Sequence, residues 1–304
     1  MKRLDVIAFA GGSNWPLWAG QHVGAFSAEG IDLALTLTPT SAHMAQALRA
    51  GTAQVALTSI DNVIAYANGH GEVPLDGPAD FFSFMGVDDG LLSIMAQPGI
   101  KTVSALRGKT LAVDALTTGF AFVLKEILAQ NGIGDEDVTY LAVGTGAERL
   151  AALKTDQCSA TLLNAPLCLA AESAGKVRVL RTRDILGSYQ GIVGASRRSW
   201  ARENPDLLAA FIRGFYASLQ WLSDPRNKNA ACAILRERLP SVERAVDLAY
   251  DVLIASGGLE RTLEIDRSGV DCVIRLRNRY GNRSGELGGP DRYIDDAFRR
   301  EALA

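Results

Sequence analysis

Polar side chains recur at points where the sequence passes from a predicted strand into a predicted helix. Ser13 and Asn14, for example, lie between a strand pattern at residues 4–9 and a helix pattern at residues 15–23. Comparable junctions supply Thr40, Ser41, Thr58, Ser59, Thr117, Thr118, Gly119, Gly144, Thr145 and Asn164. Individually, such residues are typical of helix N-caps, because Ser, Thr and Asn satisfy the free N–H groups of a first helical turn. Together they predict a polar binding site, since strand ends in an open α/β sheet converge on one crevice.

Several helix N-termini that face one crevice would favour a negatively charged ligand. They offer free N–H donors and the positive ends of helix dipoles, which suit a carboxylate, sulfonate or phosphate. Among the junctions, the run Thr117-Thr118-Gly119 is the best candidate for direct contact with the anion.

Aromatic side chains beside these junctions suggest where a planar ligand would stack. Trp15 and Trp18 are three residues apart and therefore share one helix face. We expect one of them to pack in the core and Trp15, the nearer to the loop, to stack on the ligand. Phe84 and Phe120 are alternative wall residues, although core packing is the default for both.

Two acidic residues at the junctions allow either a structural role or a ligand contact. Asp61 follows Ser59 by two residues, so it either stabilises a helix N-terminus or binds a ligand amine or ring N–H. Asp114 ends a strand, where it either stabilises a turn or contacts the ligand. A catalytic alternative pairs His43 with Asp114 or Asp61 as an acid–base couple. A solvated His43 on its helix is the default.

The remaining sequence offers little for catalysis or for a metal. It has no GxSxG motif, Cys–His pair or nucleotide-binding loop. Its three histidines have no metal-binding spacing, so neither a metal nor a cofactor is expected. The four cysteines, Cys158, Cys168, Cys232 and Cys272, lie far apart, which favours free thiols over a disulfide. These features favour binding over catalysis.

The overall composition predicts an ordinary globular protein and argues against disorder. The chain has 304 residues, 48% hydrophobic content, 21% charged residues and a formal net charge of −3. Such a chain can bury a large core, in one large domain or two lobes. The charge gives no reason to expect binding to nucleic acid or an anionic membrane. No apolar run is long enough for membrane insertion or, after Lys2-Arg3, for a secretory leader. The protein is therefore expected in the cytoplasm unless a leader preceded Met1.

Strand and helix patterns alternate as far as residue 196, which predicts an α/β fold. The predicted strands are residues 4–9, 31–37, 54–58, 81–87, 91–96, 110–113, 138–143, 160–163, 177–180 and 192–195. After Ser199 the patterns become mostly helical, at residues 205–222, 230–238, 242–254, 266–280 and 291–303, with a flexible connection at 282–290. The order predicts two α/β lobes with a helical C-terminal region.

Several short motifs together resemble a known family. Pro16-Leu17-Trp18-Ala19 follows the first strand, and Glu29-Gly30-Ile31-Asp32-Leu33 follows Gly24 and Phe26. Further motifs lie at residues 47–53, at residues 99–113, and at Ala195-Ser196-Arg197 with Asn204-Pro205-Asp206. In this order, across residues 4–222, they resemble the SsuA-like group of ABC-transporter solute-binding proteins. That group also contains proteins that handle the pyrimidine precursor of thiamine.

The resemblance implies the type II periplasmic-binding-protein fold, with a ligand in a cleft between two lobes. Lobe one would comprise residues 1–88 plus 191–304, and lobe two residues 89–190. It also implies an ABC permease as partner and a periplasmic location. The Cys-rich motif of the thiamine-pyrimidine synthases is absent, which argues against their chemistry.

Two functions are therefore expected, in order of preference. The first is the solute-binding protein of an ABC importer, with a small organic ligand that is anionic and carries an aromatic, sulfonate or carboxylate group. The alternative is a cytoplasmic enzyme on the same fold, similar to the dihydroxyphthalate decarboxylases or the menaquinone-pathway dehydratases. That enzyme would be a lyase and would use His43, Asp114 and Asp61.

Overall fold

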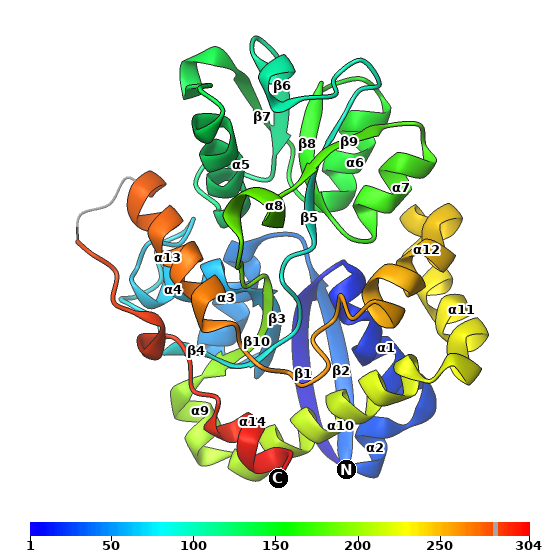
Figure 1. Ribbon diagram of the computed structural model, residues 1–304. Helices are drawn as coiled ribbons and strands as arrows, with labels where there is room; N and C mark the ends of the chain where they lie inside the picture. Colours follow the sequence, from blue (N-terminus) through cyan, green and yellow to red (C-terminus); the bar gives the residue numbers. More distant parts are fainter. Residues whose placement is uncertain (282–284) are drawn as a thin grey trace.

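The computed structural model describes residues 1–281 and 285–304, and part of the predicted 282–290 connection thus lies outside the described residues. Two five-stranded sheets form the centres of two stacked halves (Figure 1). Both chain termini lie at the far end of the lower half, which contains the first strand. The α/β fold predicted from the alternating pattern is confirmed.

The first sheet brings together the beginning of the chain and one later strand. Its strand order is β2-β1-β3-β10-β4, in which β1 runs parallel to β2 and β3, and β10 runs antiparallel to β3 and β4. The strands are β1 (Lys2–Phe9), β2 (Ile31–Thr38), β3 (Val55–Ser59), β4 (Phe81–Gly86) and β10 (Ile192–Arg197).

The second sheet is built from the middle of the chain. Its order is β7-β6-β8-β5-β9, with β6 parallel to β7 and β8, and β5 antiparallel to β8 and β9. The strands are β5 (Leu92–Ala96), β6 (Thr110–Val113), β7 (Thr139–Ala142), β8 (Ala160–Asn164) and β9 (Val177–Arg181). Both sheets therefore present parallel strands whose carboxyl ends lead into helices, as a ligand crevice requires.

The chain crosses between the sheets twice, and the two crossings touch at their backbones. A Cβ atom built on Gly191 would lie 2.1 Å from the backbone nitrogen of Gly90, so only glycine fits at this position. Next to this contact, Asp88 Oδ1 accepts hydrogen bonds from the backbone N–H groups of Gly90, at 2.8 Å, and Ile192, at 3.0 Å. The buried Asp88 carboxyl thus joins the two connections.

Helices cover the sheets where the sequence places amphipathic segments between strands. In the first half these are α1 (Trp15–Val23), α2 (Ala25–Ala28), α3 (Ser41–Ala50) and α4 (Ile60–Ala67). In the second half they are α5 (Gly119–Gln130), α6 (Gly146–Lys154), α7 (Leu167–Ser173) and α8 (Arg183–Leu186).

The C-terminal part is mostly helical, as predicted. Its helices are α9 (Arg198–Glu203), α10 (Pro205–Ser223), α11 (Lys228–Arg238), α12 (Val246–Tyr250), α13 (Arg267–Tyr280) and α14 (Ala297–Ala302). The helical pattern predicted at residues 242–254 is confirmed, as three consecutive segments: a 3-10 helix, Pro240–Ala245, then α12, then a π-helical turn, Asp251–Ala255. Within residues 1–281 and 285–304, no helix is both long and apolar enough to cross a membrane.

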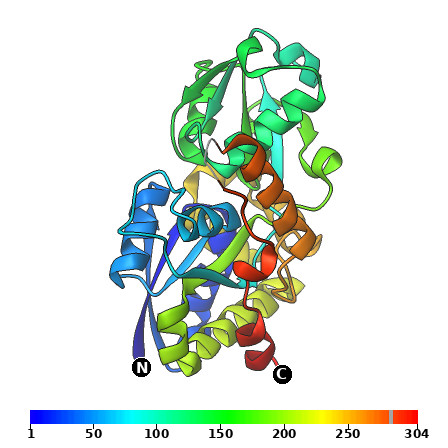
Figure 2. The same ribbon diagram turned by 90° about the vertical axis from the view of Figure 1, so that its left-hand side faces the viewer.

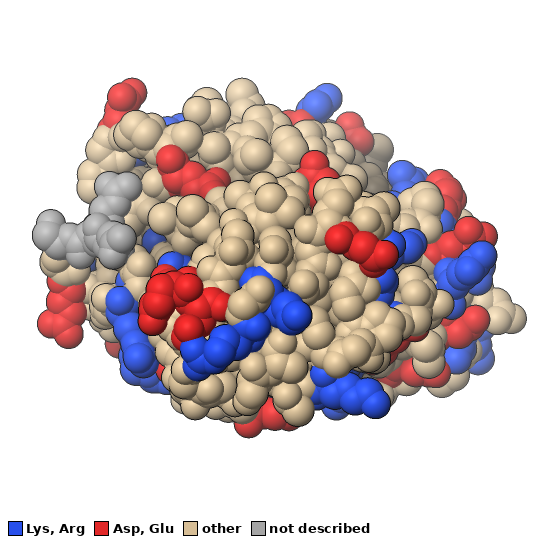
Figure 3. Space-filling model, turned by 90° about the horizontal axis from the view of Figure 1, so that it is seen from above, with Lys and Arg blue, Asp and Glu red and all other residues tan. Residues whose placement is uncertain are grey.

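Helix α13 connects the two halves along one side of the molecule (Figure 2). Toward the first half, Arg277 pairs with Asp61 of α4. Toward the second half, the Tyr280 hydroxyl donates a 2.7 Å hydrogen bond to Glu126 of α5, and Arg279 Nη1 lies 3.0 Å from the same carboxylate. Seen from above, the outer face of the molecule carries acidic and basic groups in alternation rather than one large patch of either sign (Figure 3).

Candidate functional site

A cavity of about 360 Å³ lies between the two sheets and draws its walls from both. It is lined by Phe9, Ala10, Gly11, Ser13, Pro39, Thr40, Ser41, Leu57, Ser59, Asp61, Asn62, Glu72, Asp114, Ala115, Thr118, Gly119, Phe120, Gly144, Thr145, Gly146, Arg149, Asn164, Leu167 and Ile192. Nearly all of these residues stand at strand-to-helix junctions or just after them. The volume is typical of a pocket for a small organic molecule.

Hydroxyl side chains cap the helices that point at this cavity. Thr40 accepts a hydrogen bond from the backbone N–H of His43, and Ser59 accepts one from Asp61 at 3.2 Å. In the other half, Thr118 caps α5, and Thr145 forms a capping box with Glu148 at the start of α6. The N-cap roles expected for these junction residues are confirmed, and they orient the helix N-termini toward the cavity.

Arg149, at the amino-terminal end of α6, is the only cation among the described residues that line the cavity. Its side chain is buried, and its hydrogen bonds go to the carbonyl oxygens of Gly144, at 2.7 Å, and Leu162, at 3.3 Å. Burial lowers the pKa of this guanidinium, whereas the nearby carboxylates Asp114 and Glu148 raise it. No carboxylate in the part of the chain that the structure describes forms an ion pair with Arg149. A buried arginine without a paired acid has hydrogen-bonding capacity that suits an anionic group.

Asn164 lies beside this arginine, where the two halves meet. A Cβ atom built on Gly146 would lie 3.9 Å from both Arg149 Nη2 and Asn164 Oδ1. On the facing loop, a Cβ atom on Gly11 would lie 3.9 Å from Asn164 Nδ2 and 3.8 Å from Ser13 Oγ. The Cβ atom on Gly146 would also lie 2.6 Å from Leu167 Cδ1, so this position is closely packed. Around the two glycines, a guanidinium, an amide and a hydroxyl from both halves come near one another.

The acidic residues of the cavity have partners of their own. Asp61 receives hydrogen bonds from Arg277, and Glu72 receives one of 2.7 Å from the Ser41 hydroxyl. Asp114 accepts a 2.7 Å hydrogen bond from the Thr118 hydroxyl. Asp61 thus has its charge compensated within the fold, whereas Asp114 faces the cavity across from Arg149.

Most of the residues predicted from the sequence line this one cavity. They are Ser13, Ser41, Ser59, Asp61, Asp114, Thr118, Gly119, Phe120 and Asn164. Their lining position is an observation, whereas their contact with a ligand stays a prediction. Arg149 was not predicted, although a cation at the start of a helix opposes the helix dipole and could have indicated a special role.

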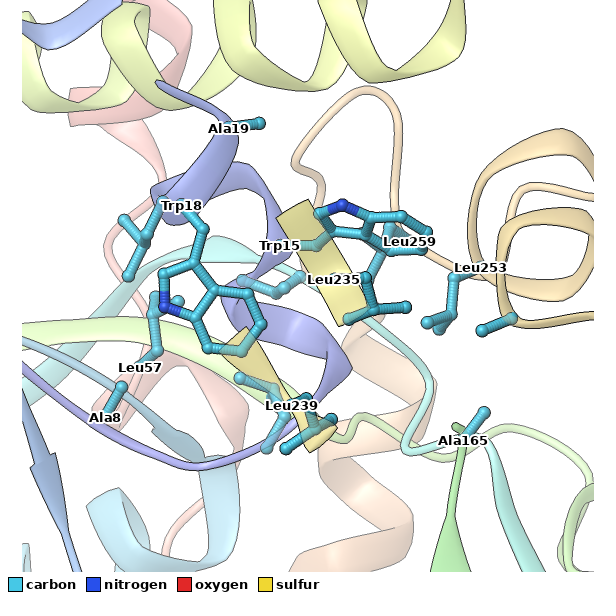
Figure 4. Close-up of a cluster of buried hydrophobic side chains, with 14 of the residues drawn as sticks. Ala8, Trp15, Trp18, Ala19, Leu57, Ala165, Leu235, Leu239, Leu253 and Leu259 are labelled. Carbon is cyan, nitrogen blue, oxygen red and sulfur yellow. The ribbon is translucent and has the colours of Figure 1, made fainter. Parts of the chain in front are cut away.

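The prediction that Trp15 stacks on the ligand is wrong. Its side chain is fully buried in the core, among Leu235, Leu253 and Leu259 (Figure 4). The indole Nε1 donates a 3.0 Å hydrogen bond to the carbonyl oxygen of Ala231 on α11. Since the C-terminal helices cover this side of α1, Trp15 does not reach the cavity.

Three other predicted contacts also lie outside the cavity. Asn14 is buried, and its Nδ2 donates a 2.7 Å hydrogen bond to the Phe9 carbonyl oxygen, which fixes the loop that follows β1. Thr58 is buried and accepts a 2.9 Å hydrogen bond from Asn62. Thr117 is exposed on the outer side of its loop. Asn14 and Thr58 therefore support residues of the cavity wall without lining the cavity, and Thr117 contacts solvent.

The acid–base couple with His43 is also wrong. His43 is exposed on α3, does not line the cavity, and its Nδ1 lies 2.9 Å from the Thr38 hydroxyl. Asp61 is held by Arg277. Neither residue is therefore placed to exchange a proton with Asp114.

Two five-stranded α/β halves around a shared cavity define the type II fold of periplasmic binding proteins. A family model described as "NMT1/THI5 like" matches residues 13–227. The chain belongs to this NMT1/THI5-like family.

Solved structures share the fold across almost the whole chain. A protein from Bordetella bronchiseptica matches with a TM-score of 0.81 and 18% identity, over 99% of this chain and 97% of that one. The periplasmic nitrate-binding protein NrtA from Synechocystis matches with a TM-score of 0.80 and 14% identity, over 99% of this chain and 88% of that one. The periplasmic aliphatic sulphonate binding protein SsuA from Escherichia coli gives a TM-score of 0.71 and 18% identity, over 99% of both chains. No curated protein matches the chain in sequence.

Proposed function

We propose that the protein is the solute-binding component of an ABC importer and that it holds a small organic anion in the cavity between its lobes. Arg149 carries this proposal, because it is a buried cation that faces a cavity and has no ion-pair partner among the described residues. A carboxylate or sulfonate would form charge-assisted hydrogen bonds with its guanidinium group. The hydroxyl of Ser13 and the amide of Asn164 would orient the same group.

The fold supports a binding cycle based on lobe closure. Lobe one, residues 1–88 plus 191–304, and lobe two, residues 89–190, would move about the two crossings near Asp88 and Gly191. Closure would bring Ser13 toward Arg149 and Asn164 and would exclude water from the ligand. The partner that receives the ligand would be an ABC permease, and the location would be the periplasm.

The similar proteins support an anion as the ligand. Nitrate and aliphatic sulphonates are named for the binding proteins NrtA and SsuA, and both ligands are oxyanions. The present cavity adds apolar wall residues, among them Phe9, Leu57 and Phe120, which suit an organic group attached to the charged one.

The test is a thermal-shift panel of alkanesulfonates, aromatic carboxylates and aminopyrimidines, with the wild-type protein and the Arg149→Gln variant. A ligand at 100 times its Kd stabilises the folded state by about 2.7 kcal/mol, which raises the Tm measurably. We expect an anion to raise the Tm of the wild type and to have little effect on Arg149→Gln. Arg236→Gln, which changes an exposed cation outside the cavity, is the control. An equal response of wild type and Arg149→Gln, or none from the whole panel, would contradict the proposal.

A further inference from the structure

A second pocket, of about 250 Å³, shares no lining residue with the first. Its walls come from the start of β5, from α7, from the end of β9 with the start of α8, and from residues 252–258 in the C-terminal region. The two halves of the molecule therefore meet in this pocket as well.

A tight contact around Gly12 separates the two pockets. A Cβ atom on Gly12 would lie 2.7 Å from Leu253 Cδ1 and 2.8 Å from Pro166 Cδ. On one side of this contact, Asn164 and Leu167 line the first cavity. On the other side, Ala165, Cys168 and Leu169 line the second. The segment from the end of β8 into α7 thus contributes one set of side chains to the first cavity and another set to the second pocket.

The charges in the second pocket are strongly unbalanced. Arg178, Arg181 and Arg183 all line it, against the single carboxylate of Asp89. Asp89 lies 3.4 Å from Arg183, and Glu172, which does not line the pocket, lies 3.1 Å from Arg178. Arg181 therefore has no ion-pair partner among the described residues. Three guanidinium groups around one small pocket repel one another and are stabilised by an anion between them.

Two of these arginines retain donors without a partner. The Nε of Arg178 is buried and has no hydrogen-bond partner within the described residues, although its Nη2 reaches Glu172 at 3.1 Å. For Arg181, the described part of the chain provides neither an ion pair nor a side-chain hydrogen bond. A buried donor that is left unsatisfied destabilises the fold, and a bound acceptor would remove that cost.

From this arrangement, we infer that the second pocket binds a small oxyanion bearing a phosphate or carboxylate group. Arginine guanidinium groups bind both kinds of group in a bidentate manner. The first cavity differs in its charge, since there a single cation faces three carboxylates. Because the pocket lies between the two halves, an anion in it would bias their relative position and hence the affinity of the first cavity.

The test is a calorimetric titration with inorganic phosphate at low ionic strength, carried out on the Arg149→Gln variant so that the first cavity lacks its anchor. Succinate in a parallel titration distinguishes a carboxylate from a phosphate preference, and sodium chloride at matched ionic strength controls for general screening. We expect phosphate or succinate to bind Arg149→Gln as it binds the wild type. The additional changes Arg178→Gln and Arg181→Gln together should weaken that binding by about tenfold or more.

Arg181→Gln alone is a second variant that avoids any loss of folding, because Arg181 is exposed and lacks the contacts of Arg178. It should weaken binding severalfold, whereas the matched control Arg236→Gln on α11 should not. The inference is overturned if Arg149→Gln alone abolishes binding, if the Arg178 and Arg181 variants bind as before, or if neither anion exceeds chloride. The first outcome would assign the anion to the first cavity, whereas the other two do not depend on whether an organic anion binds there.

Discussion

Arg277 and Asp61 form a buried ion pair between α13 and α4, two helices that are 216 positions apart at this contact. The guanidinium Nε and Nη2 donate hydrogen bonds of 2.6 and 2.5 Å to the two carboxylate oxygens. The two side chains are only 5% and 2% exposed. This pairing explains why Asp61 lines the cavity without offering a free charge to a ligand.

Breaking this pair should strongly destabilise the protein. Arg277→Met leaves the Asp61 carboxylate buried without a counter-charge, and such a change costs about 3–5 kcal/mol. The double variant Asp61→Asn/Arg277→Met should recover part of that loss, because it removes both charges. Urea unfolding measures the difference. Arg279→Met is the control, since Arg279 is 59% exposed and its pairing with Glu126 should contribute about 1 kcal/mol or less. An equal cost for both single variants would refute the structural role given to the Arg277–Asp61 pair.

Stability should also depend on pH through Asp88. Burial raises the pKa of Asp88 to about 6 from its ordinary 3.8, against the opposing effect of the hydrogen bonds from Ile192 and Gly90. A raised pKa means that the folded state binds the proton more tightly than the unfolded chain does. Its stabilising contribution is therefore complete below about pH 3.8 and is lost as the pH rises through about 6. A shift of about two units corresponds to about 3 kcal/mol.

The Asp88→Asn variant isolates this contribution from the other titrating groups. Both backbone N–H groups donate to Oδ1, so an asparagine oxygen can accept the same two hydrogen bonds. We expect the variant to match the wild type near pH 4 and to exceed it in stability at pH 7.5, as measured by denaturant unfolding at both values. Parallel pH profiles for the two proteins would show that Asp88 does not titrate in this range.

The contact between the two crossings should tolerate no side chain. In Gly191→Ala, the new methyl group would lie 2.1 Å from the backbone nitrogen of Gly90. Overpacking of this kind costs about 1–3 kcal/mol. Gly99→Ala is a matched control, because a Cβ atom there meets nothing within 4 Å. The unfolding free energy of Gly99→Ala should stay within about 0.5 kcal/mol of the wild-type value. Thermal unfolding of the two variants distinguishes them, and a tolerated Gly191→Ala would mean that the crossings can separate readily.

Trp15→Phe should affect stability but not ligand binding. The change removes the hydrogen bond to the Ala231 carbonyl oxygen and part of the edge-on contact with Tyr250, whose ring centroid lies 6.1 Å away. We expect a loss of about 1–3 kcal/mol in unfolding free energy. The Kd for any ligand identified in the panel should be unchanged. A large loss of affinity with normal stability would instead support the stacking role that the sequence suggested.

The strands and the junctions could be predicted from the sequence because both depend on local patterns. Each of the ten predicted strands lies within two residues of its observed position. The capping residue Ser59 ends β3, and Thr118 and Thr145 lie in the short loops after β6 and β7. Convergence of strand ends then places side chains such as Ser13 and Asn164 at one cavity, although they are far apart in the chain.

The errors concern residues whose surroundings come from distant parts of the chain. Trp15 is covered by α11, and Asp61 forms an ion pair with Arg277 of α13. The sequence near residues 15 and 61 contains no pattern that would indicate these distant partners. Arg149 looks like an ordinary cation on an amphipathic helix, since its neighbours Glu148 and Lys154 are charged as well. Only the packing of α6 against β8 shows that its guanidinium is buried.

The position of α13 has a consequence for the order in which the parts of the chain can assemble. Residues 267–280 are translated after both sheets are complete, yet Arg277, Arg279 and Tyr280 bind partners in each half. Until that helix emerges, Asp61 and Glu126 lack these partners. A chain that contains all ten strands but lacks α13 would therefore hold its two halves together less firmly than the finished protein, so the arrangement of the two halves depends on a segment that belongs to neither sheet.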